Sequence, residues 1–336
     1  MQTKKFNFSR QSVDYHFDAS LGDLKAIAPK QKTIVITDEN VFAAHQKKLK
    51  GWQTIVLPPG EAHKTQATVS SVIEQLIGLG ADRQTMLVGL GGGVITDLTG
   101  YLASTFLRGV PFGFIPSSLL AMVDASIGGK NGVDVGVYKN MVGTINQPSF
   151  LLYDVSLLKS LPDGEWRNGF AEIIKHAAIK DSSMFRQLEA ASLKHYQKGK
   201  SAVQDLIKRN VLIKTKVVQA DEFEKNERRL LNFGHTLAHA IETQYNLTHG
   251  EAVSIGMVFA AGLSEELLGF RHHKRVRQLI ERYGLPTELM FDRQKVYDVL
   301  RSDKKKEADF MNFILLQKIG NSVIEKIPLK TLFNYL

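Results

Sequence analysis

The feature that most constrains the fold is an alternation, in the first half of the chain, of short β-branched runs with longer amphipathic stretches. Runs of the first kind are typical of buried strands, and the stretches between them have the apolar spacing of helices. Because parallel strands are joined by crossover helices, the alternation favours a parallel sheet with helices packed on it. Strands are expected at residues 33–37, 53–57, 85–90 and 112–116, and helices at 66–79 and 94–106.

From about Pro162 onward, long amphipathic stretches replace the β-branched runs. A single hydrophobic core stops growing near about 250 residues, and this chain has 336. We therefore expect two domains, an α/β, Rossmann-like domain over residues 1–162 and an all-α domain over residues 163–336. The helices of the second domain are expected at residues 164–179, 202–219, 236–245, 251–268 and 272–283.

The composition limits the chemistry available to the protein and indicates where in the cell it is located. The chain has no cysteine, which excludes disulfides, thiolate nucleophiles and cysteine-bound metals, so any metal must be held by histidine and carboxylate. No stretch has the roughly 18 consecutive apolar residues of a membrane span, and the N-terminus lacks the apolar region of a signal peptide. We expect a cytoplasmic protein that does not bind a membrane.

The formal charge of +9 is compatible with a nucleic-acid partner or with small anionic ligands. The basic runs at residues 47–50, 271–277 and 304–306 are scattered and carry no interleaved aromatic residues of the kind that stack on bases. We therefore expect no nucleic-acid partner, although a basic regulator that senses NAD or binds nucleic acid is an alternative that charge alone leaves open.

A glycine triplet at residues 91–93 follows a predicted strand and precedes a predicted helix. Backbone N–H groups at such a helix N-terminus can approach a pyrophosphate without interference from side chains. The strict G-x-G-x-x-G pattern is not met because Thr96 occupies its last position, so a simple tight turn is the alternative. Polar loops at residues 38–40 and 58–64 end two other strands at the same sheet edge, which supports a dinucleotide site, although Asp38 could equally cap a helix.

Three histidines lie within fifteen residues of the second half. His235 and His239 are four residues apart and so share a helix face, and His249 begins the next predicted helix. Spacing alone favours His235 and His239 as a pair of metal ligands. The zinc-protease motif also needs a glutamate directly after its first histidine, and Thr236 stands there, so a protease is disfavoured. Packed or solvated histidines are the alternative.

Glu172 lies in an otherwise apolar helical turn. A buried carboxylate is costly unless it is paired, so we expect either a metal ion or a cationic partner. Lys175, three residues later on the same face, could be that partner, and an ordinary helical ion pair is therefore the alternative to a metal ligand.

Five segments, in this order along the chain, resemble motifs of the 3-dehydroquinate synthase family. The resemblance runs from about residue 37 to residue 320. It implies a dinucleotide-binding α/β domain followed by a helical metal domain, in agreement with the reading above. The segments are Gly89-Leu90-Gly91-Gly92-Gly93-Val94, Pro116-Ser117-Ser118-Leu119-Leu120-Ala121-Met122-Val123-Asp124-Ala125-Ser126-Ile127-Gly128-Gly129-Lys130, Lys139-Asn140, Asn232-Phe233-Gly234-His235 and His249-Gly250-Glu251.

The resemblance implies an activity in the shikimate pathway. A phosphorylated seven-carbon keto acid, 3-deoxy-D-arabino-heptulosonate 7-phosphate, would be converted to 3-dehydroquinate and phosphate. The reaction would proceed by transient oxidation with NAD, phosphate elimination, re-reduction, ring opening and aldol closure, so that NAD is recycled. The implied enzyme is a phosphate-eliminating carbon–oxygen lyase that is homodimeric and uses NAD and one Zn²⁺ or Co²⁺ ion.

The resemblance also assigns roles to residues. It makes Glu172, His235 and His249 the metal ligands and leaves His239 as an acid/base group near the metal. The substrate phosphate would be bound by Lys130, Asn140 and a lysine of the Asp303-Lys304-Lys305 motif, and by Arg108 from across a dimer interface. We assign Lys305 to this role, with the other lysines of 304–306 as the alternatives. The substrate carboxylate would be bound by Lys214, Arg228 and Asn232, and the substrate hydroxyls by Asp124 and Lys175.

A further set of residues matches the family's NAD site: Asp38, Asn40, Glu61, Lys64, Gly92, Gly93, Asp97, Ser117, Ser118, Lys139, Asn140 and Ser160. The chain departs from the family pattern at three places. Thr96 and Tyr138 stand where glycine is usual, and Ser117-Ser118 replaces a Thr-Thr pair while keeping both hydroxyls. Tyr138, beside Lys139 and Asn140, could change the phosphate and nicotinamide surroundings.

Related enzymes are the alternatives, namely other sugar phosphate cyclases such as 2-deoxy-scyllo-inosose synthase and the sedoheptulose 7-phosphate cyclases, and glycerol dehydrogenase-like oxidoreductases. A cyclase whose substrate has no carboxylate would not need both Lys214 and Arg228. A simple dehydrogenase would not need phosphate ligands at Lys130 and Asn140. These residues therefore favour the phosphorylated keto acid.

Overall fold

The computed structural model describes residues 1–336 except 137, 243, 303–305 and 308. The chain divides into two compact units, each assembled from two segments. The first unit comprises Met1–Glu165 and Gly199–Phe223, and the second comprises Trp166–Lys198 and Glu224–Leu336. The division therefore differs from the single boundary expected after residue 162, because the chain returns to the first unit in a long helix, α8 (Lys200–Ala220).

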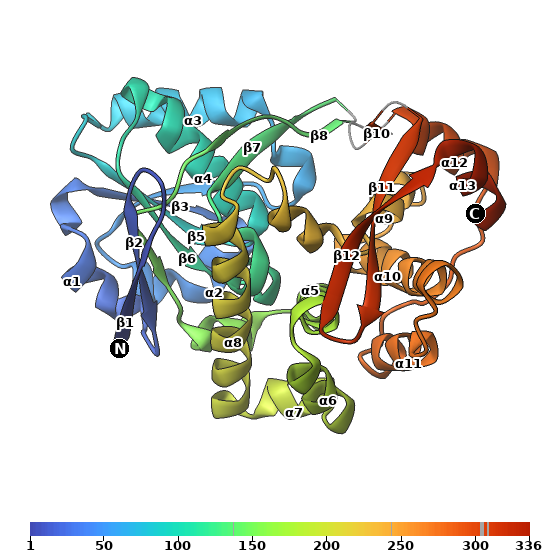
Figure 1. The fold of residues 1–336 in the computed structure, drawn as a ribbon. Helices are drawn as coiled ribbons and strands as arrows, with labels where there is room; N and C mark the ends of the chain where they lie inside the picture. The colour runs from blue at the N-terminus through green and yellow to red at the C-terminus, as the bar shows by residue number, and fades with distance from the viewer. Residues whose placement is uncertain (137, 243, 303–305, 308) are drawn as a thin grey trace. The chain divides into compact units, whose positions relative to one another are not determined.

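The first unit contains a seven-stranded sheet of order β1-β2-β9-β6-β5-β3-β4 (Figure 1). Every neighbouring pair is parallel except β1 and β2, which form an antiparallel edge. The predicted parallel sheet is thus confirmed, whereas β1, β2 and β9 were not predicted. The strands are β1 Gln2–Asn7, β2 Ser12–Phe17, β3 Thr33–Asp38, β4 Gln53–Leu57, β5 Met86–Gly91, β6 Phe112–Pro116 and β9 Phe150–Leu152.

The core of this unit lies on the central strands. Val35, Val88 and Ile115 are fully buried and pack with Leu157 and with Leu49, the last residue of α2 (Glu39–Leu49). Burial of one such aliphatic side chain contributes roughly 1.5–3 kcal/mol. The helices of the unit are α1 Leu24–Ile27, α2 Glu39–Leu49, α3 Gln66–Gly78, α4 Gly93–Thr105 and α8, with a π-helical turn, η5, at Ala121–Ala125 and a separate hairpin of β7 Lys130–Val135 and β8 Tyr138–Ile145.

The second unit is mostly helical. Its main helices are α5 Asp163–Lys180, α6 Ser182–Ala190, α7 Leu193–Lys198, α9 His235–Glu242, α10 His249–Leu268, α11 His273–Arg282, α12 Arg293–Ser302 and α13 Leu329–Tyr335. Helix α10 begins with a capping box of Thr248 and Glu251 and ends at Gly269, whose φ is +68°.

The expectation of an all-α second half is right for the helices and incomplete near the C-terminus. There, β10 Lys306–Glu307, β11 Phe310–Lys318 and β12 Asn321–Pro328 form an antiparallel sheet. In β11, residues 313–316 are all buried because the strand also packs against α10. A continuous apolar run lacks the alternation that identifies a half-buried strand, so its sequence resembles a buried helical segment.

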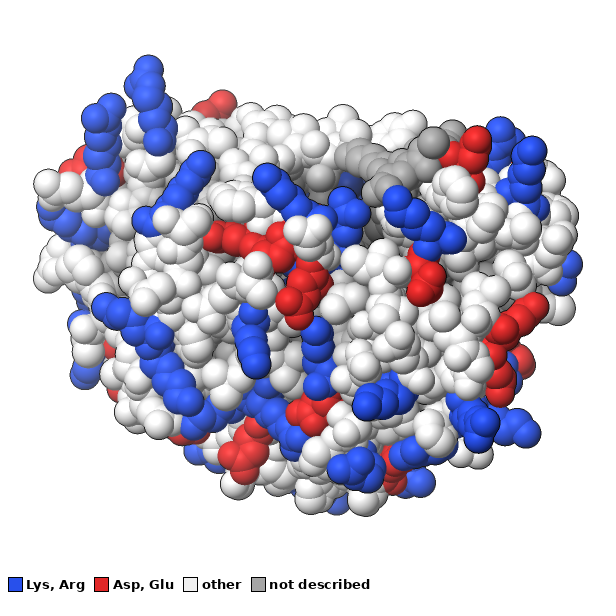
Figure 2. All heavy atoms as spheres, in the orientation of Figure 1, with Lys and Arg blue, Asp and Glu red and all other residues white. Residues whose placement is uncertain are grey.

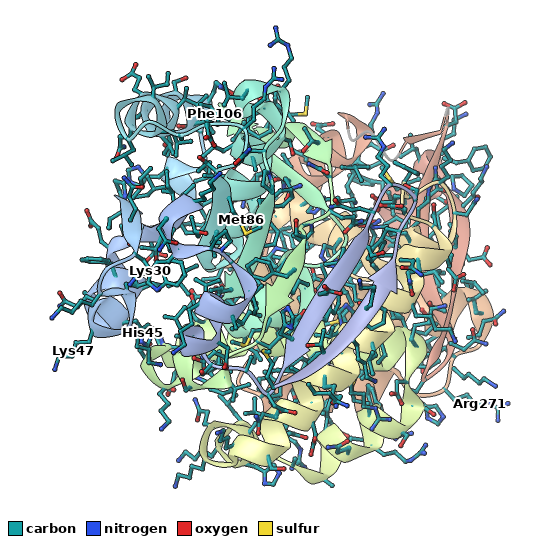
Figure 3. The ribbon with its side chains drawn as sticks, turned by 90° about the vertical axis from the view of Figure 1, so that its left-hand side faces the viewer. Lys30, His45, Lys47, Met86, Phe106 and Arg271 are labelled. Atoms are coloured by element: carbon teal, nitrogen blue, oxygen red, sulfur yellow. The ribbon has the colours of Figure 1, made fainter. Side chains whose placement is uncertain are left out.

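Two of the basic runs, at residues 47–50 and 271–277, lie mainly on solvated faces, and the run at 304–306 falls outside the residues whose side chains are described. Figure 2 shows Lys and Arg side chains spread over the visible surface, with Asp and Glu among them. Lys47 of α2 and Arg271 before α11 are both exposed and point into solvent in Figure 3. Among the residues that the structure describes, none belongs to a helix both long and apolar enough to span a bilayer.

Candidate functional site

Three side chains of the second unit converge on one point. Glu172 lies in the middle of α5, and His235 and His249 are the first residues of α9 and α10. The Nε2 atoms of His235 and His249 lie 3.5 and 3.4 Å from Glu172 Oε1. Ligands about 2.0–2.2 Å from a tetrahedral ion are roughly 3.3–3.5 Å apart. The donor set and its spacing therefore fit one divalent metal ion, and its potential ligand atoms lie within 4.8 Å of one another.

Two glycines allow helices α5, α9 and α10 to pack closely enough for the three side chains to meet. A Cβ on Gly234 would lie 2.8 Å from the backbone nitrogen of Met257 in α10, and the φ of Gly234 is +80°. A Cβ on Gly250 would lie 2.5 Å from the Cα of Asn168 in α5. Each glycine is adjacent to a candidate histidine, so the glycines permit the packing that brings the two imidazoles to Glu172.

The Glu172 carboxylate is fully buried, and its two oxygens face different partners. Its Oε2 forms an ion pair with Lys175, which is 2% exposed, while its Oε1 faces both histidines. The ion pair and the ligand arrangement, considered above as alternatives, are therefore present together. Lys175 keeps the buried carboxylate paired on its other oxygen.

The two candidate histidine ligands differ in protonation. Burial, helped by the charge of Lys175, holds the pKa of His235 well below its usual value, so the ring is neutral. Its Nδ1 lies 3.1 Å from the Phe233 carbonyl, which can only accept a hydrogen bond, so Nε2 is left as the electron-pair donor. Burial lowers the pKa of His249, but hydrogen bonds to Glu172 and Glu242 outweigh it and raise the pKa to about 9. Metal binding to His249 would release that proton.

Glu242 is a site residue that the sequence reading missed. It is the last residue of α9 and is 8% exposed, and its Oε2 lies 3.8 Å from Nδ1 of His249. Carboxylates in this place orient histidine ligands and raise their basicity. A usable signal was present, because His235, His239 and Glu242 share one helix face at intervals of four and three residues.

We expect Glu242→Gln to weaken metal affinity by about 10- to 100-fold, the usual cost of removing a group that orients a metal ligand. Competition with a chelator of known affinity measures the change. Glu265→Gln is the matched control, because Glu265 pairs with His273 at the far end of α10. Equal affinity in wild type and Glu242→Gln would remove Glu242 from the site.

His239 follows His235 by one helical turn and is exposed. Its ring lies 5.7 Å from that of His235, centroid to centroid, and the two rings are nearly perpendicular. Glu172, His235 and His249 form a group of potential ligands that does not contain His239. The structure therefore places against Glu172 the histidine that the family resemblance implies, and not the second member of the pair favoured by spacing.

In the first unit, the glycine triplet and the serine pair follow neighbouring strands, β5 and β6. Gly92 is the N-cap of α4, and the backbone N–H of Ser117 donates to the Gly91 carbonyl at 2.8 Å. A Cβ on Gly92 would lie 3.4 Å from Ser118 Oγ. The loops of Gly92, Gly93, Ser117 and Ser118 therefore lie side by side at the carboxyl edge of the sheet, where open α/β sheets bind ligands.

Lys64 contacts two other predicted cofactor residues. Its ammonium group lies 2.6 Å from Asp97 Oδ2 and 2.7 Å from Asn140 Oδ1. Burial lowers the pKa of Lys64, but Asp97 and Glu61 outweigh it and leave the pKa raised, so the side chain is charged. The sequence reading contained no sign that Lys64, which follows β4, contacts Asn140 of β8.

Asp38 is a helix cap in this structure. Its Oδ1 accepts a hydrogen bond from the N–H of Val41 at 2.9 Å, and burial raises its pKa. Asn40 follows in the first turn of α2, and Ser160 contacts His45 of the same helix. The predicted ribose and cofactor contacts of these residues stay predictions.

The predicted substrate residues are divided between the units. In the first unit, Asp124 and Lys214 form an ion pair at 2.8 Å, and Arg108 and Lys130 are exposed, as is Lys139, which is predicted for the NAD site. In the second unit, Arg228 is 3% exposed and Asn232 donates to Glu224 Oε1 at 2.8 Å. Lys305 lies outside the described residues. Of the departures from the family pattern, Thr96 is buried and donates to the Gly93 carbonyl, whereas Tyr138 is 65% exposed.

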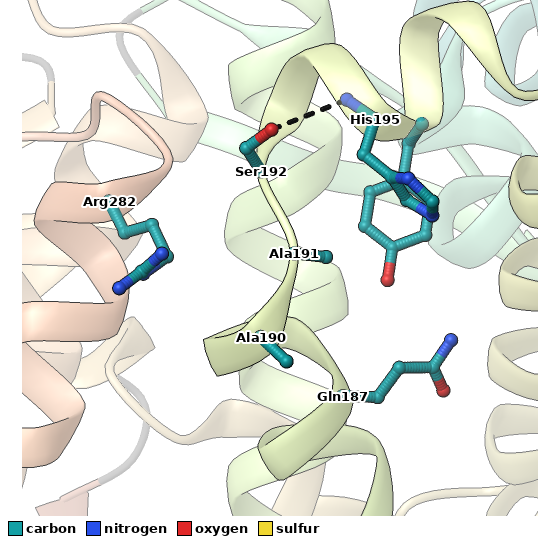
Figure 4. Close-up of a pocket in the computed structure, with 7 residues that line it drawn as sticks. Gln187, Ala190, Ala191, Ser192, His195 and Arg282 are labelled. Atoms are coloured by element: carbon teal, nitrogen blue, oxygen red, sulfur yellow. Dashed lines mark hydrogen bonds between the residues drawn. The ribbon is translucent and has the colours of Figure 1, made fainter.

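A separate hollow of about 540 Å³ lies in the second unit and is shown in Figure 4. Its lining comes from α6, from the segment after it, from α7, and from Arg282 at the end of α11. None of the predicted site residues is among the residues that line it, which are Gln187, Ala190, Ala191, Ser192, His195, Tyr196 and Arg282. The hollow is therefore not part of the candidate metal centre.

Comparison with known proteins covers almost the whole chain. Residues 54–168 match the family model for the N-terminal part of 3-dehydroquinate synthase, and residues 169–306 match the model for its C-terminal part. The chain is 41% identical over 315 residues to a 3-dehydroquinate synthase of Dehalococcoides mccartyi, covering 90% of this chain and 88% of that protein. It is 42% identical over 284 residues to a 3-dehydroquinate synthase of Pyrococcus abyssi, covering 84% of each.

Solved structures agree with this assignment. A 2-epi-5-epi-valiolone synthase from Streptomyces hygroscopicus, with NAD⁺ and Zn²⁺ bound, has a TM-score of 0.88 and 27% identity, covering 98% of this chain and 97% of that one. A 2-deoxy-scyllo-inosose synthase has a TM-score of 0.87 at 24% identity, covering 99% and 98%, which shows a shared fold. By these family matches and identities, the chain belongs to the 3-dehydroquinate synthase family.

Proposed function

We propose that this protein is a 3-dehydroquinate synthase, which converts 3-deoxy-D-arabino-heptulosonate 7-phosphate to 3-dehydroquinate and phosphate. The observation that carries the proposal is the approach of two imidazole Nε2 atoms to within 3.5 Å of Glu172 Oε1, in a chain that matches this family. The homodimer and the cytoplasmic location that the resemblance implies belong to the same proposal.

The proposed cofactors are NAD and one divalent ion, Zn²⁺ or Co²⁺. Support comes from the related 2-epi-5-epi-valiolone synthase, which was solved with NAD⁺ and Zn²⁺. Glu172, His235 and His249 would hold the ion, and the loops around Gly92 and Ser118 would receive the dinucleotide. When bound, the ion supplies Lewis-acid polarisation of an oxygen and NAD supplies a hydride acceptor that is later returned to its oxidised form.

Asn140 is proposed to present hydrogen-bond donors to the substrate phosphate. Its side-chain oxygen accepts from Lys64 at 2.7 Å, so its NH₂ group points the opposite way and keeps two donors for an anion. The φ of Asn140 is +53°, a conformation that asparagine tolerates better than most residues. Lys64 in turn holds Asp97, so one buried ammonium links the proposed phosphate and NAD residues.

The cations Lys214 and Arg228 are proposed to bind the carboxylate of the substrate. We expect Arg228→Ala to raise KM by about 10- to 100-fold while kcat changes less, because a lost hydrogen bond between charged groups costs about 1.5–3 kcal/mol. Steady-state phosphate release measures both constants. Arg229→Ala is the control, because the neighbouring Arg229 is less buried and its Nε donates to the Glu224 backbone. An unchanged KM in Arg228→Ala would remove Arg228 from the carboxylate site.

The proposed function is tested by comparing substrates in one phosphate-release assay. The highest kcat/KM is expected for the carboxylated heptulosonate phosphate, with much less release from sedoheptulose 7-phosphate and glucose 6-phosphate. Faster release from either of the latter would identify another sugar phosphate cyclase. Accumulation of NADH with glycerol, without phosphate release from any substrate, would identify a dehydrogenase.

A further inference from the structure

The turn η5, at Ala121–Ala125, is a single π-helical turn in the first unit. Ser126, which ends it, donates both its backbone N–H and its hydroxyl to the Ala121 carbonyl, at 3.2 and 2.7 Å. At the other end, Ser118 Oγ accepts from the N–H of Ala121 at 3.2 Å. Single π turns inside helical segments are rare and are frequent at functional sites.

The π turn presents Asp124 to Lys214 of α8 in an unusual way. The Lys214 ammonium group lies 2.7 Å from the Asp124 backbone carbonyl and 2.8 Å from its Oδ2. The same carbonyl also accepts from the N–H of Ile127 at 3.0 Å. The backbone carbonyl and the carboxylate of Asp124 thus both bind the Lys214 ammonium group. These two contacts fix the positions of Asp124 and of the ammonium group.

The alternative conformation of this segment is an ordinary α turn. A π turn contains about one residue more than an α turn, so its relaxation would rotate the residues beyond it by roughly 100° about the helix axis. Asp124 could not then direct both its carbonyl and its carboxylate at Lys214. Whatever stabilises the π turn therefore stabilises this contact.

We propose that Ser126 is a positioning residue, whose hydroxyl holds the π turn that sets Asp124 against Lys214. The inference rests on the proposed function, in which both of those residues contact substrate. Ser126 is 1% exposed, and the buried hydroxyl of Tyr153 lies beside it. Because the site is closed to bulk water, solvent cannot replace the serine hydroxyl when it is removed.

Ser126→Ala tests the proposal, with Ser104→Ala as its matched control. Ser104 lies in α4 of the same unit and donates to the Gly100 carbonyl at 2.6 Å, so both variants lose a serine-to-backbone bond. We expect kcat/KM for phosphate release to fall by about 10- to 100-fold in Ser126→Ala and to stay within about twofold in Ser104→Ala. Equal activity of Ser126→Ala and wild type would overturn the proposal.

A double-mutant cycle separates positioning from general destabilisation. If Ser126 acts through Asp124, then Ser126→Ala introduced into Asp124→Asn should lower kcat/KM by no more than about a further twofold. A purely structural role would multiply the two losses and would contradict the proposal.

Amide hydrogen exchange provides a readout that needs no substrate. In Ser126→Ala, exchange of residues 121–127 is expected to accelerate by at least about tenfold, while Ser104→Ala leaves it unchanged. Unchanged exchange in Ser126→Ala would show that the hydroxyl does not hold the turn. If the wild-type protein released no phosphate from the heptulosonate phosphate, the proposed function would fail, and the exchange rates would still decide the role of Ser126 in the turn.

Discussion

Glu172→Gln is expected to lose its metal ion and to lower phosphate release by about 10³-fold or more, since metal polarisation supplies several kcal/mol to such reactions. The carboxylate is the one anionic donor of the group, and both candidate imidazoles lie against its Oε1. Glutamine keeps the volume of this fully buried side chain but is a much weaker ligand. Metal content after dialysis, measured together with phosphate release, tests the prediction.

Two further variants distinguish loss of the metal ion from loss of the folded structure. Removing the charge of Glu172 also weakens the ion pair of Lys175, which by itself destabilises the protein. His249→Ala should lose the metal while it leaves the ion pair of Lys175 and Glu172 in place. Glu189→Gln, which weakens the ion pair to Arg275 elsewhere in the same unit, should keep it. Full metal occupancy in folded Glu172→Gln would show that Glu172 is not a ligand.

His239→Ala is expected to retain the metal and to lower kcat by about 10²- to 10⁴-fold, the usual contribution of a general acid or base. His239 is exposed and lies one turn from His235, outside the ligand group. Its place therefore suits proton transfer near the ion better than coordination. Metal content and single-turnover phosphate release measure the two effects separately.

His273→Ala is the control for His239→Ala, since His273 is another histidine of the second unit and pairs with Glu265. It should change neither metal content nor kcat. Loss of metal from His239→Ala would indicate that His235 and His239 are both ligands, the pair that spacing alone favours. Retention of full activity would remove His239 from the chemistry.

The central strands and main helices follow from local pattern. The predicted strands at residues 53–57 and 112–116 coincide with β4 and β6, and the helix predicted at 66–79 ends one residue later than α3. These elements are buried on a regular face, so their apolar spacing reflects their structure. The edge pair β1 and β2 was missed because β1 is mostly exposed and carries two lysines.

Other features depend on contacts distant in sequence. Helix α8 was predicted as a helix of the second domain, yet it contacts η5 in the first unit, and nothing in its own sequence specifies that partner. The π turn was also missed, because the bonds of Ser126 to a carbonyl five residues back leave no apolar periodicity to detect.

The metal group shows the same limit. Spacing could identify His235 and His239 because both lie on one helix, whereas His249 begins another helix and meets Glu172 only through tertiary packing. Gly234 and Gly250 allow that packing, but a glycine beside a histidine does not indicate which helix it will approach. The resemblance to the family's motifs indicated His249 as a candidate ligand, which the spacing of the histidines could not do.

The most direct test of a metal- and NAD-dependent cyclase is to follow phosphate and NADH together in one reaction with the heptulosonate phosphate. One phosphate per substrate and no net NADH are expected. Removal of the metal with a chelator should abolish phosphate release, and added Zn²⁺ or Co²⁺ should restore it. Phosphate release that persists in metal-free protein, or NADH that accumulates in step with substrate consumed, would contradict the proposed function.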